Sequence, residues 1–203
     1  MKENTELTLQ EIWDVSLEIL GEIDHFCRNK NIRYSLAYGS LLGAVRHGGF
    51  IPWDDDIDLI MPRPDYDRFC NSYIAAHSKC YSLATKNSLI LYARVCDTKK
   101  TIVKEYIPWA TEQTGIWIDV IPIDGIADDY DVFLMKEKNI ERSYAEMYQT
   151  RGKYAKLSIK RSLIWNIKIL FKKIKYRKYD IFELINKYRT IVNFTDFEKS
   201  DAC

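Results

Sequence analysis

The chain has 203 residues, of which 47% are hydrophobic and 13% aromatic, a composition that favours a packed globular fold and excludes a disordered chain. Its polar first residues lead into no apolar segment, and no run approaches 18 apolar residues, so we expect neither a secretory signal nor a membrane-spanning helix. The sequence therefore predicts a cytoplasmic protein, and its five scattered cysteines, without a Cys-x-x-Cys pair, suit a reducing compartment.

The formal net charge of +1 conceals an uneven distribution along the chain. Residues 1–150 hold 16 basic and 24 acidic side chains, whereas residues 151–190 hold 13 basic and 2 acidic ones. We predict two parts, a core at 1–130 and a helical basic region at 131–203. A basic region attached to an acidic body informs about binding partners and not about the fold.

The first half of the chain is predicted to alternate helices and short strands. A helix is expected at 8–29, because Thr8 and Glu11 form a capping box and apolar side chains follow at helical spacing. In chain order, the elements that follow are a buried strand at 32–37, a helix at 40–46, a strand at 57–61 that Pro62 ends, and a helix at 65–76.

The middle of the chain has the composition of β-structure. Residues 88–96 and 101–103 are predicted to form paired strands, and 115–121 a strong strand closed by Pro122. From 131 to about 190 the pattern is helical. The sequence thus predicts a mixed α/β (α+β) fold, a β-sheet flanked by helices, with a helical C-terminal third.

Four aspartates in five positions lead into the strand predicted at 57–61. Side chains of an extended chain alternate between faces, so Asp56 and Asp58 project from one face, about 7 Å apart. Two close carboxylates repel each other unless a cation lies between them. Such oxygen ligands suit Mg²⁺ or Mn²⁺, which polarise and orient phosphoryl groups. We predict that Asp56 and Asp58 are catalytic metal ligands.

A solvated loop, an EF-hand and a zinc site are the alternatives to this magnesium site. Many acidic runs are solvated loops, but the apolar continuation to Met61 is typical of a core strand. An EF-hand loop starting at Asp54 lacks the Gly required at its sixth position and the Glu at its twelfth. A zinc site formed by Cys70, His77 and Cys80 lacks a fourth ligand.

A third acid is expected, because two groups alone hold Mg²⁺ weakly. Asp119 is the candidate, since a lone charge inside the apolar run at 117–121 is costly unless something pairs it. Asp124 is the alternative if the strand boundaries differ, and a structural capping role for Asp119 also remains open.

The phosphate-binding side of the site is predicted at a Gly-Ser turn before the helix at 40–46. Gly39 allows close backbone approach, the helix N-terminus offers free N–H groups to an anion, and Ser40 adds a hydroxyl. Arg46 suits phosphate recognition, with a salt bridge to a nearby acid as the alternative, and His47 is a candidate acid or base. Trp53 is predicted to shape the substrate pocket, or else to pack.

One long segment of the chain resembles the signature block of the LicD family. Residues 34–69 carry it, and they read YSLAYGSLLGAVRHGGFIPWDDDIDLIMPRPDYDRF. The Gly-Ser-Leu-Leu-Gly, Ile-Pro-Trp-Asp-Asp-Asp-Ile-Asp and Asp-Tyr-x-Arg-Phe pieces occur in the family's order, which makes the resemblance highly specific. The segment at 117–125 also fits, so the resemblance covers about residues 9–126.

The resemblance implies a nucleotidyltransferase-like fold with a metal-binding Asp-x-Asp. Family members move phosphocholine from CDP-choline onto lipopolysaccharide or teichoic-acid glycans and release CMP, whereas fukutin-type relatives transfer ribitol phosphate. Carried over to this sequence, the family pattern implies that Asp56 and Asp58 bind Mg²⁺ or Mn²⁺, that Asp119 is the third acid, and that Gly39 and Ser40 face the donor phosphates.

Two functional alternatives remain at this stage. Family members usually continue for longer at the C-terminus, which favours a truncated, non-catalytic, membrane-associated relative. An enzyme of the same fold that uses another nucleotide-linked donor is the other alternative.

The basic segment at 157–176 separates into two faces on a helical wheel. Ile167, Phe171 and Ile174 lie on the apolar face, and Lys168 and Lys172 lie opposite. Such a helix is expected to lie on an anionic membrane surface, which predicts peripheral attachment at the inner face of the membrane. The alternative is a helix packed on the acidic body with solvated lysines. No aromatic platform accompanies the charge, so nucleic acid is not a predicted partner.

Overall fold

The computed structural model describes residues 6–82, 84–88, 90–104 and 113–125, and the single positions 138, 167, 171 and 174. The chain divides into two compact units, Met1–Ile123 and Asp124–Cys203. The predicted boundary at 130/131 and nearly all of the predicted C-terminal helices lie outside the described residues. The fold described below is that of the first unit.

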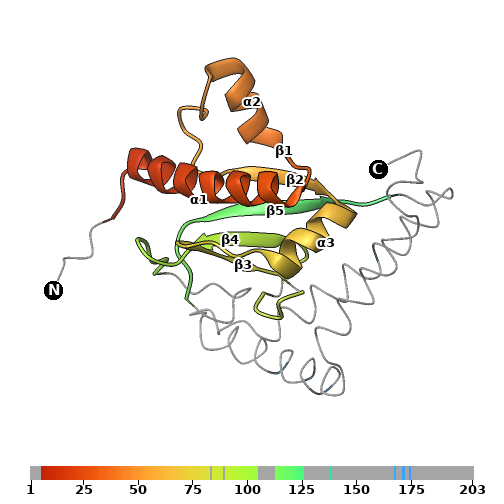
Figure 1. Cartoon of the computed structure of the whole chain (residues 1–203). Helices are drawn as coiled ribbons and strands as arrows, with labels where there is room; N and C mark the ends of the chain where they lie inside the picture. Colours follow the sequence, from red (N-terminus) through yellow and green to blue (C-terminus); the bar gives the residue numbers. More distant parts are fainter. Residues whose placement is uncertain are drawn as a thin grey trace. The chain divides into compact units, whose positions relative to one another are not determined.

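A five-stranded mixed sheet forms the body of this unit, as the sequence predicts (Figure 1). The strands are β1 (Ser35–Leu36), β2 (Asp58–Pro62), β3 (Ser78–Tyr81), β4 (Ala93–Asp97) and β5 (Trp117–Ile123), in the spatial order β1-β2-β5-β4-β3. Only β2 and β5 pair in parallel, and the other three neighbouring pairs are antiparallel.

Helices α1 (Leu9–Lys30) and α3 (Arg63–Ser72) cover one face of the sheet (Figure 1). Every second residue of a strand points toward these two helices. Leu59, Ile118 and Val120 are such residues, and they are fully buried in one core cluster with Ile23 and Phe69. Helix α2 (Tyr38–His47) contacts β2 and stands clear of this layer in the view. The opposite face of the sheet carries Asp58, Arg94 and Asp119 among apolar neighbours such as Ile60 and Ile121.

Helix α1 has the ends that its sequence predicts. Thr8 accepts from the backbone N–H of Glu11 and Glu11 accepts from the backbone N–H of Thr8, which completes the capping box. Its buried positions recur at helical spacing: Ser16, Ile19, Ile23, Phe26 and Cys27. The helix ends at Asn31, which adopts the left-handed conformation with φ 55°.

Several predicted boundaries were wrong. The helix expected at 65–76 spans Arg63–Ser72, and the strands expected at 57–61 and 115–121 span Asp58–Pro62 and Trp117–Ile123. The strand expected at 32–37 contains only Ser35–Leu36. The strand expected at 88–96 begins at Ala93, and its partners are β3 and β5, whereas residues 101–103 form no strand. Strand β3 was not predicted, because its four residues, Ser-Lys-Cys-Tyr, carry no clear alternation, with a burial pattern that shows one exposed position among four.

Pro122 does not close β5, which continues to Ile123. The backbone N–H of Asp119 donates to Ile57, on the β2 side, so alternation turns the nitrogen of Pro122 toward the β4 side. Pairing with β4 reaches only Ala93, opposite Val120, so no ladder hydrogen bond is lost at Pro122. Among the described helices, none is both long and apolar enough to cross a membrane.

Candidate active site

Strand register aligns two acids and one arginine on neighbouring strands. Asp58 is the direct partner of Asp119 in the parallel β2–β5 pair, and Asp119 is the direct partner of Arg94 in β4. All three alternate with buried core residues, so their side chains project from the face opposite α1 and α3. The register thus brings Asp58 and Asp119 together, whereas Asp124 belongs to the second unit.

Asp119 has the charged partner that an acid in this strand requires. Its carboxylate accepts from Arg94 twice, from Nε at 2.6 Å and from Nη2 at 3.3 Å. The guanidinium is also held at 3.1 Å from the hydroxyl of Tyr92 and 4.6 Å above the ring of Trp117. A bidentate pair fixes the carboxylate in place. Burial nevertheless raises the pKa of Asp119, although Arg94 opposes that shift.

Asp54, Asp55 and Asp56 form a compact acidic cluster before β2. One carboxylate oxygen of each lies within 4.8 Å of the others, and this is the only such group of three acidic, histidine or cysteine residues within the described ranges. The expected strand starts one residue late, at Asp58, so Asp56 lies in the preceding loop. Burial and the negative charges of Asp58, Asp54 and Asp55 raise the pKa of Asp56 to about 6.

The loop and helix α2 hold the cluster against the start of β2. The backbone N–H of Asp58 donates to the Ser40 hydroxyl at 2.9 Å, and the indole N–H of Trp13 donates to the carbonyl of Asp54 at 2.7 Å. A Cβ on Gly39 would lie 2.7 Å from Oδ2 of Asp54. The residues of the predicted Gly-Ser turn lie instead in the first turn of α2, where Gly39 lets the Asp54 carboxylate approach closely and no side chain caps the helix N-terminus.

The charge balance of this region suits a hard divalent cation. Burial raises the pKa of Asp58, and the charges of Asp119 and Asp54 add to the effect, while Arg94 opposes it. Acids whose charged forms are disfavoured by one another are relieved by a cation among them. Carboxylate oxygens are the ligands that Mg²⁺ and Mn²⁺ prefer, so the chemistry of these donors fits the predicted metal. Within the described residues, however, the close group of three acids is Asp54, Asp55 and Asp56, and not the predicted set of Asp56, Asp58 and Asp119.

The other predicted substrate-binding residues lie at different distances from the acidic cluster. Trp53 directly precedes Asp54 and is 77% exposed. Arg46 and His47 are exposed at the far end of α2, about 10 Å along the helix from Gly39. The zinc interpretation is wrong, since His77 pairs with Glu22 at 3.1 Å on the surface while Cys70 and Cys80 are buried.

Part of the sequence matches known proteins of one family. Residues 31–126 match the family model described as LicD/FKTN/FKRP, nucleotidyltransferase domain. Over 138 residues, 64% of this chain, the sequence is 33% identical to the lipopolysaccharide cholinephosphotransferase LicD of Haemophilus influenzae. Residues 31–126 thus form a LicD-family domain. The chain spans about half (51%) of the length of the Haemophilus relative. A segment of 28 residues, 14% of this chain, is 68% identical to human ribitol 5-phosphate transferase FKRP, and it covers 6% of that protein.

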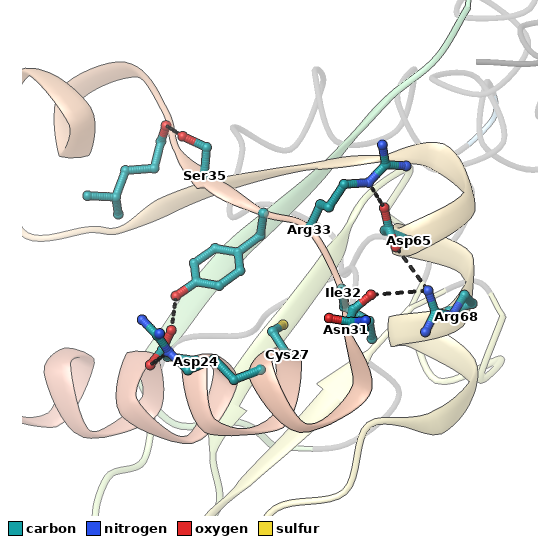
Figure 2. Close-up of a pocket in the computed structure, with 11 residues that line it drawn as sticks. Asp24, Cys27, Asn31, Ile32, Arg33, Ser35, Asp65 and Arg68 are labelled. Atoms are coloured by element: carbon teal, nitrogen blue, oxygen red, sulfur yellow. Dashed lines mark hydrogen bonds and ion pairs between the residues drawn. The ribbon is translucent and has the colours of Figure 1, made fainter. Parts of the chain in front are cut away.

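This domain also has an open groove, and the charged side chains that line the groove pair with one another. Figure 2 shows this groove of about 880 Å³ at the C-terminal end of α1. Arg33 and Arg68 both bind the buried carboxylate of Asp65, at 2.6 and 3.2 Å, and Asp24 binds Arg28 and the hydroxyl of Tyr34. These contacts join α1, β1 and α3, so we assign the groove a structural role.

Sequence reasoning missed the most important partner in this domain, Arg94. Its signal was present: Arg94 is a lone charge between Ala93 and Val95, as Asp119 is between Ile118 and Val120. Two isolated opposite charges in two apolar strands indicate a cross-strand pair. Trp13 gave no such signal, because its contact with Asp54 spans 41 positions of the chain.

Proposed function

We propose that the chain is a metal-dependent transferase that moves phosphocholine from CDP-choline to a glycan of the cell envelope, lipopolysaccharide or teichoic acid, and releases CMP. The observation that carries this proposal is the acidic cluster beside the aligned pair of Asp58 and Asp119, at the N-terminus of α2. The naming of the Haemophilus relative as a lipopolysaccharide cholinephosphotransferase supports the choice of the transferred group.

The proposed metal ligands are Asp56, Asp58 and Asp119. A carboxylate has about four lone-pair positions, so Asp119 accepts from Arg94 and still offers an oxygen. A bound Mg²⁺ or Mn²⁺ would polarise the donor phosphoryl group and neutralise the charge that develops on the leaving CMP. Arg94 fixes the orientation of Asp119, and Ser40 fixes the backbone of Asp58, so neither acid needs to reorganise.

In the proposed reaction an acceptor hydroxyl attacks the phosphorus that carries choline. The new bond joins the acceptor oxygen to phosphorus, the bond from phosphorus to the bridging oxygen breaks, and CMP leaves with that oxygen. One carboxylate of the site accepts the proton of the attacking hydroxyl. The free N–H groups of the first turn of α2, at Gly39 and Ser40, are positioned to contact donor phosphate oxygens.

A lipid-linked glycan is the proposed form of the acceptor. The basic segment 157–176 is proposed to lie on the anionic cytoplasmic surface of the membrane. This segment lies outside the described residues apart from Ile167, Phe171 and Ile174, which are helical and exposed. All three are on the apolar face that the sequence predicts.

Release of nucleoside monophosphate tests the proposal directly. Incubation of the full chain with Mg²⁺ and a panel of CDP- and UDP-linked donors should release CMP most rapidly from CDP-choline. Asp58→Asn should lower that rate at least about a hundredfold. It should leave the fold intact, because loss of a repelled charge relieves strain. Asp14→Asn, an exposed acid on α1, is the matched control and should retain full activity.

The same assay decides between the proposal and its competitors. Undiminished CMP release by Asp58→Asn contradicts the assigned site. Preference for CDP-ribitol would favour the second candidate, ribitol phosphate transfer, which the short segment shared with FKRP suggests. An absence of product with every donor, and of Mg²⁺-dependent nucleotide binding in calorimetry, would indicate a non-catalytic relative.

A further inference from the structure

A small apolar cavity without an assigned ligand lies beside the acidic cluster. It has a volume of about 270 Å³ and lies among α1, α2 and the loop that joins α2 to β2. Leu17, Leu20, Leu36 and Ile57 provide aliphatic walls, and Phe50 provides an aromatic one. Phe50 is held rigidly, since its ring stacks on Trp13 at 5.1 Å with an interplanar angle of 8°.

One charge faces this cavity. Asp54 is the only ionisable residue of its lining, and its carboxylate lies against Gly39 at the cavity rim. The other polar side chain of the lining, Ser40, already accepts from the backbone of Asp58. The cavity thus offers apolar contact and one negative charge, with few groups to satisfy a hydrogen-bond donor.

We infer that this cavity binds the trimethylammonium head group of the choline donor; the inference rests on the proposed function. A quaternary ammonium ion is a cation covered by methyl groups and has no N–H donor. It can therefore leave water for an aliphatic pocket without losing hydrogen bonds, provided that a carboxylate and an aromatic ring balance its charge. Asp54 and Phe50 supply those two partners.

The size and position of the cavity agree with this occupant. Pockets for drug-sized ligands measure roughly 300–1,000 Å³, so 270 Å³ holds a head group and excludes a whole nucleotide. Gly39 and Ser40 belong both to its wall and to the first turn of α2. A donor with its methyl groups in the cavity therefore places its phosphates next to that turn and the acidic cluster.

The same properties disfavour other head groups. Ribitol carries several hydroxyl groups and ethanolamine carries three N–H donors, and each would lose hydrogen bonds to water on entering an aliphatic pocket. The cavity accordingly favours choline, because it lacks the hydrogen-bonding groups that ribitol and ethanolamine require. This selection is a difference in affinities between head groups, and it is measurable without catalysis.

Methyl-group NMR titration of the full chain in EDTA tests the inference without metal or turnover. Choline and tetramethylammonium should shift the methyl signals of Leu17, Leu20 and Ile57. Dimethylbutanol, in which a carbon replaces the nitrogen of choline, should bind less tightly. Asp54→Asn should weaken choline binding about tenfold, the order expected for the loss of one charged partner, and should leave dimethylbutanol unaffected.

Two substitutions on α2 separate cavity filling from general damage. Ala44 lines the cavity, so Ala44→Leu should abolish choline binding and raise the KM for CDP-choline with little change in kcat. Val45 is 79% exposed and lies outside the lining, so Val45→Leu should change neither. Melting temperatures of both variants confirm that α2 remains folded.

The outcomes distinguish this inference from the proposed function. Choline-induced shifts that fall elsewhere, or equal binding of choline and dimethylbutanol, overturn the inference even if CDP-choline is a substrate. Choline binding in the cavity without CMP release from any donor leaves the cavity assignment standing and removes the proposed function. An unchanged KM in Ala44→Leu with normal turnover counts against the cavity alone.

Discussion

Burial disfavours the charged forms of three acidic side chains at the centre of this domain, and neighbouring acids add to the effect at Asp56 and Asp58. The pKa values of Asp56, Asp58 and Asp119 are all raised, in each case first by burial. Arg94 opposes the shift at Asp119 and Asp58, whereas Asp56 faces only acids among the causes of its shift. The cluster therefore destabilises the metal-free protein at neutral pH and gains most from a bound cation.

The pH dependence of stability should reveal this repulsion. A carboxyl group whose pKa is higher in the folded chain binds more protons when folded, so stability falls as pH rises from the ordinary value, 3.8, to about 6 for Asp56. In EDTA, the melting temperature should therefore be higher at about pH 5 than at about pH 7.5. Asp56→Asn should reduce this difference, whereas Asp14→Asn should not.

Mg²⁺ should act in the opposite sense in the same experiment, because protons and the cation compete for the same carboxylates. Added Mg²⁺ should raise the melting temperature at about pH 7.5 and have little effect at about pH 5. An equal effect of Mg²⁺ at both pH values, or on wild type and Asp56→Asn alike, would show that the cation binds elsewhere.

At the scale of elements, α2 and the acidic loop are joined through backbone contacts at Gly43. A Cβ on Gly43 would lie 2.6 Å from the carbonyl oxygen of Gly49 and 3.0 Å from the backbone nitrogen of Ile51. The loop turns away from the helix at Gly48, which adopts φ 68°. This close approach sets the position of Asp54 relative to the first turn of α2.

Gly43→Ala should therefore displace the loop. Backbone atoms cannot yield as a flexible side chain can, so we expect weaker Mg²⁺ binding and at least about tenfold slower CMP release. Gly21→Ala is the matched control: it lies in helix α1 with nothing within 4 Å of an added Cβ. It should stabilise the protein by about 0.5–1 kcal/mol. Chemical denaturation and the donor assay measure both effects, and normal activity in Gly43→Ala would contradict the proposed coupling.

Local signals predicted the helices better than the strands. The capping box and the apolar spacing of α1 are each contained within a short stretch of sequence. Strand β3 and the partners of β4 depend instead on pairing across the sheet, which no local pattern encodes. Pro122 was misjudged because its effect depends on where the pairing with β4 ends.

The site follows the same division between local and long-range information. Asp56 and Asp58 were predicted from their spacing alone, and Asp119 from its isolation in an apolar strand. The alignment of Asp58 with Asp119 and the pairing with Arg94 required the strand register. The placement of Asp54 against Gly39 needed the path of the loop around α2.

At the scale of the whole molecule, the first unit contains every residue of the acidic cluster and of the cavity. The parallel pair of β2 and β5 makes this possible, because a long crossover through α3, β3 and β4 returns the chain in the same direction. Asp58 and Asp119 are thus direct partners in the sheet although 60 residues lie between them in the sequence. The second unit contributes a different property, its charge.

The charge of residues 151–190 should attach the full chain to anionic membranes. With 13 basic and 2 acidic side chains there, the chain should sediment with phosphatidylserine-containing vesicles at low salt, and not with pure phosphatidylcholine. Each lysine near such a surface contributes about 1 kcal/mol, and Lys→Glu also adds a repelled negative charge, so the triple variant K168E/K172E/K175E should bind at least about a hundredfold more weakly. A matched triple variant of exposed lysines in the first unit, K86E/K99E/K104E, changes the net charge equally and should retain binding. Equal loss of vesicle binding in both triple variants would mean that net charge alone governs attachment. An absence of vesicle binding by the wild-type chain would favour the alternative, a basic helix packed on the acidic body.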